Sequence, residues 1–183
     1  MRKLTHQENL AIQKERSRLP RLPFVVVLNN IRSIHNVGAI CRTADGSGVE
    51  KLWLCVITGF PPNAQLSKTA LGSEAFVNWE YAKRAEDVVT NYRRQGYQIV
   101  VLEQTDESVE FQDFVPQAPV CLVVGNEISG VDPVILPLAD AAVAIPMQGI
   151  KNSLNVEVAF GIVAYHFTSS LMKSSSGMNQ TYV

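Results

Sequence analysis

Short apolar runs rich in valine, isoleucine and leucine recur along this chain, and segments with helical character separate them. The runs expected to form strands cover residues 24–28, 51–57, 76–81, 97–102, 120–124 and 141–145. The segments expected to form helices cover residues 36–47, 85–95 and 153–171. Strands that alternate with helices predict an α/β fold, a parallel sheet with helices on both faces. In such sheets the binding crevice lies beyond the carboxyl ends of the strands.

The last expected helix, residues 153–171, is apolar around most of its circumference. A helix of this kind must be buried on more than one side. In a domain of this size a subunit interface is a natural second side, so the C-terminal helix predicts a homodimer.

The chain has 183 residues, enough for one domain and a short extension. We expect a basic N-terminal helical extension over residues 1–22, the main domain over residues 23–172 and a flexible polar tail over residues 173–183. Thr5 and Glu8 have the spacing of a helix capping box. Residues 1–21 contain six Lys/Arg and two Glu, a net charge of +4, whereas the whole chain carries −1. This arm is a candidate phosphate-binding device, although a solvated helix carries the same pattern.

The cysteines and the N-terminus bear on the compartment. Cys41, Cys55 and Cys121 are scattered among apolar neighbours, and an odd number of such residues favours reduced thiols in the core of a cytoplasmic protein. No apolar stretch is long enough to span a bilayer, and the first residues lack the apolar core of a secretory signal. We therefore expect a cytoplasmic protein with no membrane partner.

Common nucleotide-binding and metal-binding motifs are missing from the sequence. Gly46 and Gly48 follow a helix and lack a third glycine at the required position, so they do not form a dinucleotide fingerprint. No P-loop motif is present. His6, His35 and His166 lack the spacing of metal ligands, so no metal site is expected.

Three polar clusters begin at or just after expected strand ends, at residues 36–42, 125–130 and 145–155. Gly125 directly follows a buried strand, where a glycine allows a ligand to approach the backbone, although an ordinary turn would look the same. Ser153 and Asn155 have the character of helix caps. One cap would suffice, so two such side chains near Lys151 indicate a ligand pocket.

Arg42 lies in an otherwise apolar stretch of the first cluster, six residues after Asn36. An arginine on the buried side of a helix needs an anionic partner, either structural or bound. A substrate phosphate would serve, because the guanidinium group binds phosphate with two hydrogen bonds.

Taken together, the three clusters resemble the sequence motifs of the SpoU/TrmH family of RNA ribose 2′-O-methyltransferases, over about residues 23–170. The matching residues are Asn36, Gly38 and Arg42 in the first motif, Gly125, Asn126, Glu127 and Gly130 in the second, and Pro146, Ser153, Leu154 and Asn155 in the third. One departure is Glu157, which stands where relatives often carry a small polar residue.

The resemblance implies a homodimer with S-adenosylmethionine bound at the interface and a C-terminal trefoil knot in each chain. The cofactor pocket would be built from the loops after the fourth, fifth and sixth strands. The residues implied to bind the cofactor are Leu102, Glu103, Thr105, Gly125, Asn126, Ile145, Met147, Ser153 and Leu154.

The implied catalytic residues are Asn36, Arg42, Glu127, Ser153 and Asn155. Because a guanidinium group stays protonated, we expect Arg42 to hold the substrate phosphate while the other four position the ribose. The expected partner is structured RNA, with tRNA favoured over rRNA because the basic arm is short. Few aromatic residues are available to stack on long single strands. Two alternatives are a non-catalytic RNA-binding or assembly protein with the same fold and a small-molecule α/β enzyme.

Overall fold

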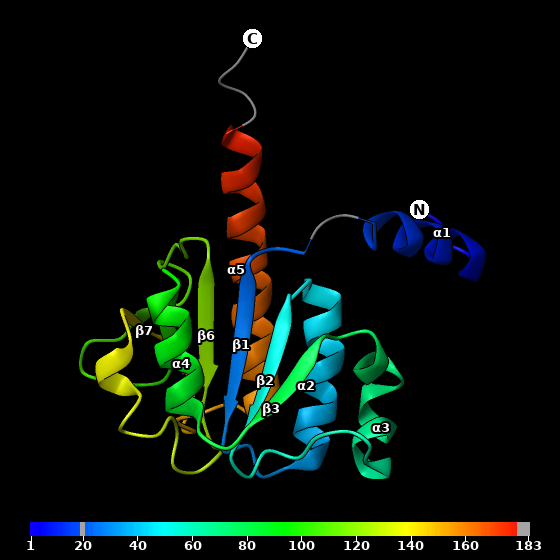
Figure 1. Ribbon diagram of the computed structural model, residues 1–183. Helices are drawn as coiled ribbons and strands as arrows, with labels where there is room; N and C mark the ends of the chain where they lie inside the picture. The colour runs from blue at the N-terminus through cyan, green and yellow to red at the C-terminus, as the bar shows by residue number, and fades with distance from the viewer. Residues whose placement is uncertain (19–20, 179–183) are drawn as a thin grey trace.

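The computed structural model describes residues 1–18 and 21–178, whose strands form one parallel sheet (Figure 1). Seven strands occur within these residues, and all of their pairings are parallel. The strands are β1 (Phe24–Asn29), β2 (Lys51–Cys55), β3 (Trp79–Ala82), β4 (Gln98–Leu102), β5 (Val109–Glu110), β6 (Val120–Val124) and β7 (Ala141–Ala144).

The strand order is β3-β2-β1-β6-β4-β7-β5. Leu28 at the end of β1 and Leu102 at the end of β4 both align with Val124 at the end of β6. The carboxyl ends of these three strands therefore lie at one level, at the lower end of the sheet in Figure 1. Since the chain runs from β1 to β3 toward one edge and then places β4 on the other side, the order reverses here. Ligand crevices form at such points in open α/β sheets.

Helices cover both faces of the sheet, as the alternation of strands and helices predicts. One face carries α2 (Ile34–Ser47), α3 (Ala64–Ala70) and α5 (Val156–Met178), and the other carries α4 (Ala85–Arg94) (Figure 1). Val26 and Leu28 of β1 pack into the first layer, whereas Val25 and Val27 pack into the second. β1 is fully buried because it lies between the two layers.

All three cysteines belong to this core. Cys41, Cys55 and Cys121 are free and buried. Burial raises the pKa of the Cys41 and Cys55 thiols to about 12 and raises that of Cys121 as well, so all three stay protonated near neutral pH. They act as small apolar side chains.

Four short elements were not predicted: α3, the two-residue strand β5 and the 3-10 helices η1 (Ser73–Ala75) and η2 (Leu136–Leu138). Asn63 reads as one more loop residue after Gly59, Pro61 and Pro62, yet its side chain caps α3 by accepting the Gln65 and Leu66 amides at 2.9 and 3.2 Å. The strand expected at residues 76–81 begins only at Trp79.

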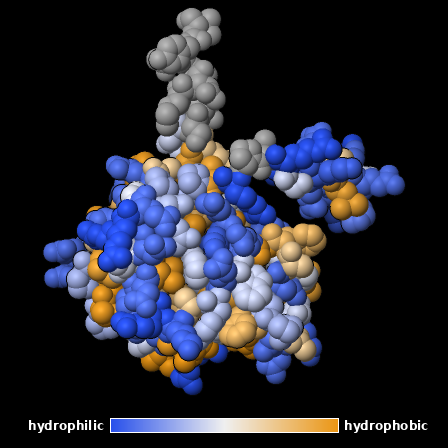
Figure 2. Space-filling model, viewed as in Figure 1, coloured by the Kyte–Doolittle hydropathy of each residue, from blue (hydrophilic) through white to orange (hydrophobic). Residues whose placement is uncertain are grey.

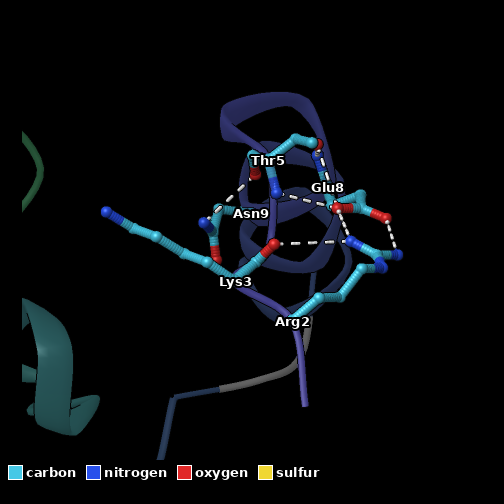
Figure 3. Close-up of polar contacts among 5 residues, drawn as sticks. All are labelled: Arg2, Lys3, Thr5, Glu8 and Asn9. Atoms are coloured by element: carbon cyan, nitrogen blue, oxygen red, sulfur yellow. Dashed lines mark hydrogen bonds and ion pairs between the residues drawn. The ribbon is translucent and has the colours of Figure 1, made fainter.

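The N-terminal helix α1 (His6–Arg16) is held by local interactions, and none of its residues is buried. The Thr5 hydroxyl accepts the Glu8 amide at 3.3 Å, and the Glu8 carboxylate accepts the Thr5 amide at 2.8 Å (Figure 3). The predicted capping box is therefore confirmed. Arg2 pairs with Glu8 at 2.6 Å, and this contact together with the Thr5 bonds lowers the pKa of Glu8 to about 2. Figure 2 shows α1 as a largely hydrophilic surface beside the body.

Helix α5 buries one face and exposes another. Phe160, Val163 and Phe167 are buried on the side of α2, whereas Val158 and Tyr165 are 44% and 55% exposed. The two exposed side chains are seven residues apart, so they lie on the same face of the helix.

The segment expected to be a flexible tail from Lys173 onward begins as helix, because α5 continues to Met178. The last five residues of that predicted tail, 179–183, lie outside the described part of the chain. Among the helices described, none is long and apolar enough to cross a membrane.

Helices α2 and α3 approach each other closely at Gly38. A Cβ atom at this position would collide with Thr69 Oγ1 and with the Leu66 carbonyl oxygen, and would lie 3.1 Å from the Ala70 amide nitrogen. The glycine of the first motif is therefore explained by helix packing.

We expect Gly38→Ala to lower the free energy of unfolding by about 1–3 kcal/mol, because the added methyl group must push the α3 backbone away. Urea denaturation measures this difference. Gly149→Ala is the control, since a Cβ there meets no atom within 4 Å, and its effect should stay within about 1 kcal/mol. Equal losses in the two variants would contradict the packing argument.

Candidate active site

A cavity of about 250 Å³ opens at the carboxyl ends of β4, β6 and β7. The loops after these three strands supply most of its walls, and α5 closes it. The lining residues are Leu102, Glu103, Gln104, Val124, Gly125, Asn126, Glu127, Ile128, Gly130, Ala144, Ile145, Met147, Asn152, Ser153, Leu154, Val156 and Ala159. The crevice expected from the strand order is thus present, and it lies where the second and third motifs meet.

Two glycines allow the loop after β6 to fold tightly beside the cavity. A Cβ atom on Gly125 would collide with the backbone of Gly130 and Val131, and one on Gly130 would collide with the Glu103 carboxylate. Gly130 also has a φ of +71°, which favours glycine. Both glycines of the second motif are therefore required by close approach within the protein itself.

Asn126 shapes this loop and ties it to β1. Its Oδ1 accepts the amides of Ile128 and Ser129 at 2.9 and 3.1 Å, and its Nδ2 donates to the Asn30 carbonyl oxygen at 2.7 Å. Both polar atoms of the Asn126 side chain are thus hydrogen-bonded to backbone groups.

The loop after β4 contacts both of the other loops. The Glu103 carboxylate accepts the Val131 amide at 2.9 Å, and the Gln104 side chain donates to the Asn152 carbonyl oxygen at 2.6 Å. Gln104 and Asn152 both line the cavity; each lies in a loop expected to form the cofactor pocket, but neither was named as a cofactor-binding residue. Neither matches a motif position, and a side chain that bonds a distant carbonyl group gives no local sequence signal.

Glu127 is the centre of a clamp between the loop after β6 and the start of α2. Its carboxylate accepts the amides of Arg32 and Ser33 at 3.0 and 3.1 Å and the Asn36 side-chain amide at 2.9 Å. Partial burial by itself raises the pKa of Glu127, but these hydrogen bonds outweigh burial and hold its pKa below the ordinary value. The group is therefore ionised at neutral pH.

Asn155 joins the third motif to the other two. Its Nδ2 donates to Asn36 Oδ1 at 3.2 Å, and its Oδ1 accepts the Glu157 amide at 2.9 Å, which caps the start of α5. One residue from each motif, Asn36, Glu127 and Asn155, therefore lies in one continuous hydrogen-bond chain. The Glu157 backbone takes part in this cap.

Arg42 does not lie where the sequence predicted. It was expected on the buried side of its helix, yet it is exposed, and it makes no ion pair with any residue in the described ranges. The apolar neighbours that suggested burial, such as Ile40 and Cys41, point to the core from the other side of α2.

The residues implied to bind the cofactor all line the cavity except one. Thr105 instead lines a second hollow of about 440 Å³. The loop after β4 turns away from the first cavity after Gln104. Of the residues implied to be catalytic, Glu127 and Ser153 line the first cavity, while Asn36 and Asn155 lie behind it in the hydrogen-bond chain.

We expect Glu127→Gln to lower the free energy of unfolding by about 1–2 kcal/mol at pH 7, because an NH₂ group would then face an N–H donor. Since the folded-state pKa of Glu127 is depressed, its charge stabilises the fold above the unfolded-state pKa. That contribution is lost as the pH falls through the lower folded-state value. Urea denaturation between pH 7 and pH 3 measures the difference in the free energy of unfolding between the unaltered protein and Glu127→Gln. This difference should become smaller below about pH 4.5. A difference that stays constant with pH would contradict the stabilising role of the Glu127 charge.

Comparison with known proteins identifies relatives over most of the chain. The sequence profile of the SpoU rRNA Methylase family matches residues 23–165. The tRNA (guanosine(18)-2′-O)-methyltransferase of Aquifex aeolicus is 35% identical over 164 residues, which cover 86% of this chain and 77% of that protein. The protein of the same name from Escherichia coli K12 is 32% identical, and the match covers 84% of this chain and 65% of that protein.

Solved structures give the same answer. The crystal structure of the A. aeolicus TrmH/SpoU tRNA modifying enzyme has a TM-score of 0.80 and 31% identity, covering 94% of this chain and 86% of the other. The AdoMet-bound rRNA methyltransferase from Sinorhizobium meliloti has a TM-score of 0.73 and 27% identity, and the match covers 82% of this chain and 58% of the other. The three motifs, the fold and these matches lead to one conclusion: the chain belongs to the SpoU rRNA methylase family.

Proposed function

We propose that this protein transfers a methyl group from S-adenosylmethionine to a ribose 2′-hydroxyl group in tRNA. The observation that carries the proposal is the hydrogen-bond chain Glu127–Asn36–Asn155, which lies beside a cavity built from three loops. The names of the curated relatives favour tRNA. The same relatives are named as methyltransferases, so the non-catalytic alternative is less well supported.

The chemistry of the cavity fits S-adenosylmethionine. Gly125 lets the loop after β6 fold tightly, and the backbone of this loop then forms part of the cavity wall against which a flat heterocycle would pack. Apolar side chains from Leu102, Ile145 and Leu154 would pack against that ring. When bound, this cofactor supplies a methyl group on a positively charged sulfur.

Each polar residue of the site has a distinct task. Glu127 uses its oxygens on two backbone amides and on Asn36, so it orients Asn36 and fixes the start of α2. Ser153 lines the cavity, and its hydroxyl group would contact the ribose. Arg42 forms no ion pair among the described residues and would bind the phosphate next to the target nucleotide. Positioning of this kind accounts for a large part of the rate in a displacement reaction.

The N-terminal segment, residues 1–21 with a net charge of +4, would be a second contact for RNA. Its helix α1 has Lys14 and Arg16 in the last turn, and none of the side chains of α1 is buried. Its positive charge would bind the phosphate backbone without regard to sequence.

The active form would be a homodimer that uses the exposed face of α5. A Cβ atom on Gly46 would lie 2.8 Å from Tyr165 Oη, so this tyrosine lies over α2. Arg42 is four residues before Gly46 and therefore shares that face of the helix. A partner that covers Val158 and Tyr165 would bring Arg42 to the interface, close to the site of one of the two subunits.

The finer features of the fold and the compartment follow from the family. The proposed C-terminal trefoil knot would involve the loops after β4 and β7, which contact each other through Gln104 and Asn152. The free thiols of the described residues suit the reducing cytoplasm.

The experiment that tests the function is incubation of the protein with radiolabelled S-adenosylmethionine and either bulk tRNA or bulk rRNA, followed by nucleoside mass spectrometry. We expect a 2′-O-methyl nucleoside in the tRNA sample. Label found only in rRNA would overturn the substrate, and no transfer to either would overturn the enzyme assignment.

We expect Arg42→Ala to reduce methyl transfer to tRNA by at least about 100-fold, because the substrate phosphate loses its bidentate partner. Binding of S-adenosylmethionine, measured by calorimetry, should stay within about twofold, since Arg42 does not line the cavity. Arg94→Ala is the matched control, because Arg94 is exposed on α4 and also lacks an ion pair in the described residues. Loss of cofactor binding together with activity would indicate a structural role instead.

We expect Tyr165→Glu to convert the dimer to monomers, because a buried unpaired charge is costly at an interface. Ile162→Glu should act in the same direction. Sedimentation velocity measures both, and a sedimentation coefficient that equals that of the unaltered protein would refute the interface.

A further inference from the structure

Three aromatic rings gather on the outer strand of the sheet. Phe60, from the loop after β2, lies 4.8 Å from the ring of Tyr81 and 6.2 Å from the ring of Trp79, measured between centroids. Phe60 is 44% exposed and Tyr81 is 40% exposed. We call these three residues the aromatic cluster. The sequence suggested few exposed aromatic residues, and their gathering at one place comes only from the fold.

The aromatic cluster is held in a fixed geometry. Tyr81 Oη donates to the Val56 carbonyl oxygen at 3.0 Å, and the Val56 amide donates to the Ala82 carbonyl oxygen at 3.0 Å. Val56 has a φ of 60°, a strained conformation for a β-branched residue. Strain of this kind persists only where the surroundings enforce it, and it is concentrated at functional sites.

The loop that carries Phe60 is joined to the candidate active site. The buried Thr58 hydroxyl donates to the Leu28 carbonyl oxygen at 3.1 Å and accepts the Ile31 amide at 3.0 Å. Gly59 packs against Ile34 so closely that a Cβ atom on it would collide with that side chain. Ile31 and Ile34 flank Arg32 and Ser33, whose amides bond Glu127. Gly59, the residue before Phe60, therefore contacts the segment that leads into Asn36.

The charges around this loop favour a polyanion. Arg32 precedes the start of α2 and Lys83 follows β3, both at the carboxyl ends of strands. Both are exposed, and neither forms an ion pair within the described part of the chain. The nearest acid on β3, Glu80, is already paired with Lys51.

We propose that the aromatic cluster stacks on an unpaired base of the RNA substrate, with Arg32 and Lys83 on the adjoining phosphates. This inference rests on the proposed function and adds a base-binding subsite to it. An aromatic face binds any base without reading its identity. A protein partner on the same rings would not need two free cations beside them, so RNA is the occupant that the surface fits.

The test compares Phe60→Leu with Phe76→Leu in the full chain. Phe76 is 74% exposed and lies before β3, near the amino ends of the strands, so it is the matched control. Phe60→Leu should raise the Kd for unfractionated tRNA, measured by filter binding, about tenfold. It should raise KM for methyl transfer by a similar factor, with kcat and cofactor affinity within about twofold. Phe60→Tyr keeps the ring and should restore binding.

The outcomes separate this inference from the proposed function. Unchanged RNA affinity in Phe60→Leu, or an equal loss in Phe76→Leu, would overturn the subsite while methylation by the unaltered protein still stands. If the unaltered protein binds tRNA without methylating it, the Kd comparison still decides the subsite. If it binds no RNA, the subsite and the proposed function both fail. If Phe60→Tyr binds tRNA as weakly as Phe60→Leu does, the lower affinity would come from a disturbed fold and not from the missing ring. This result would also overturn the subsite.

Ultraviolet cross-linking of the unaltered protein to tRNA gives a second readout that needs no variant. Mass spectrometry should find nucleotides attached to the peptide containing Phe60 or to the one containing Tyr81. Cross-links confined to other peptides would contradict the proposal.

Discussion

The carboxylate of Glu127 is the contact on which the arrangement of the site depends. It lies after β6, yet its partners are two backbone amides and an amide side chain at the start of α2. Those amides would otherwise be unsatisfied at a helix N-terminus, where a negative charge is also favoured by the helix dipole. One ionised side chain thereby joins the two halves of the sheet at the place where the strand order reverses.

The consequences extend outward in both directions from this carboxylate. Toward the C-terminus, Asn36 accepts a hydrogen bond from Asn155. Asn155 in turn caps α5 and so positions the helix that closes the cavity. Toward the outer strands, the segment held by Glu127 also contacts Thr58. The loops after β6, β1 and β2 are therefore joined by hydrogen bonds, and they connect the candidate active site with the aromatic cluster.

The sequence was sufficient for the layers of the fold and for the parts of the site that lie in motifs. Continuous runs such as residues 120–124 are typical of strands buried on both faces, and the structure has this strand so. The prediction for Arg42 was wrong because apolar neighbours in sequence do not fix which side of a helix a residue occupies. Helix α3 was missed because the prolines before it conceal the capping role of Asn63.

The remaining features could not be predicted because they depend on contacts between distant backbone atoms. The amides of Arg32 and Ser33 carry no side-chain signature, although their hydrogen bonds, together with that of Asn36, lower the pKa of Glu127. The glycine at position 130 reads as an ordinary turn residue until the Glu103 carboxylate is found where its side chain would be. Thr105 was assigned to the cavity on family resemblance alone, and the chain turns away before reaching it.

The self-contained helix α1 has a kinetic consequence. Eleven residues stabilised by a capping box and one ion pair form a helix that is marginal in water, because no tertiary packing supports it. An RNA that binds this arm must spend part of the binding free energy on ordering it, which lowers the affinity per contact. In the proposed RNA contact such an arm would release its target readily, and a methylated product would then not occupy the enzyme for long.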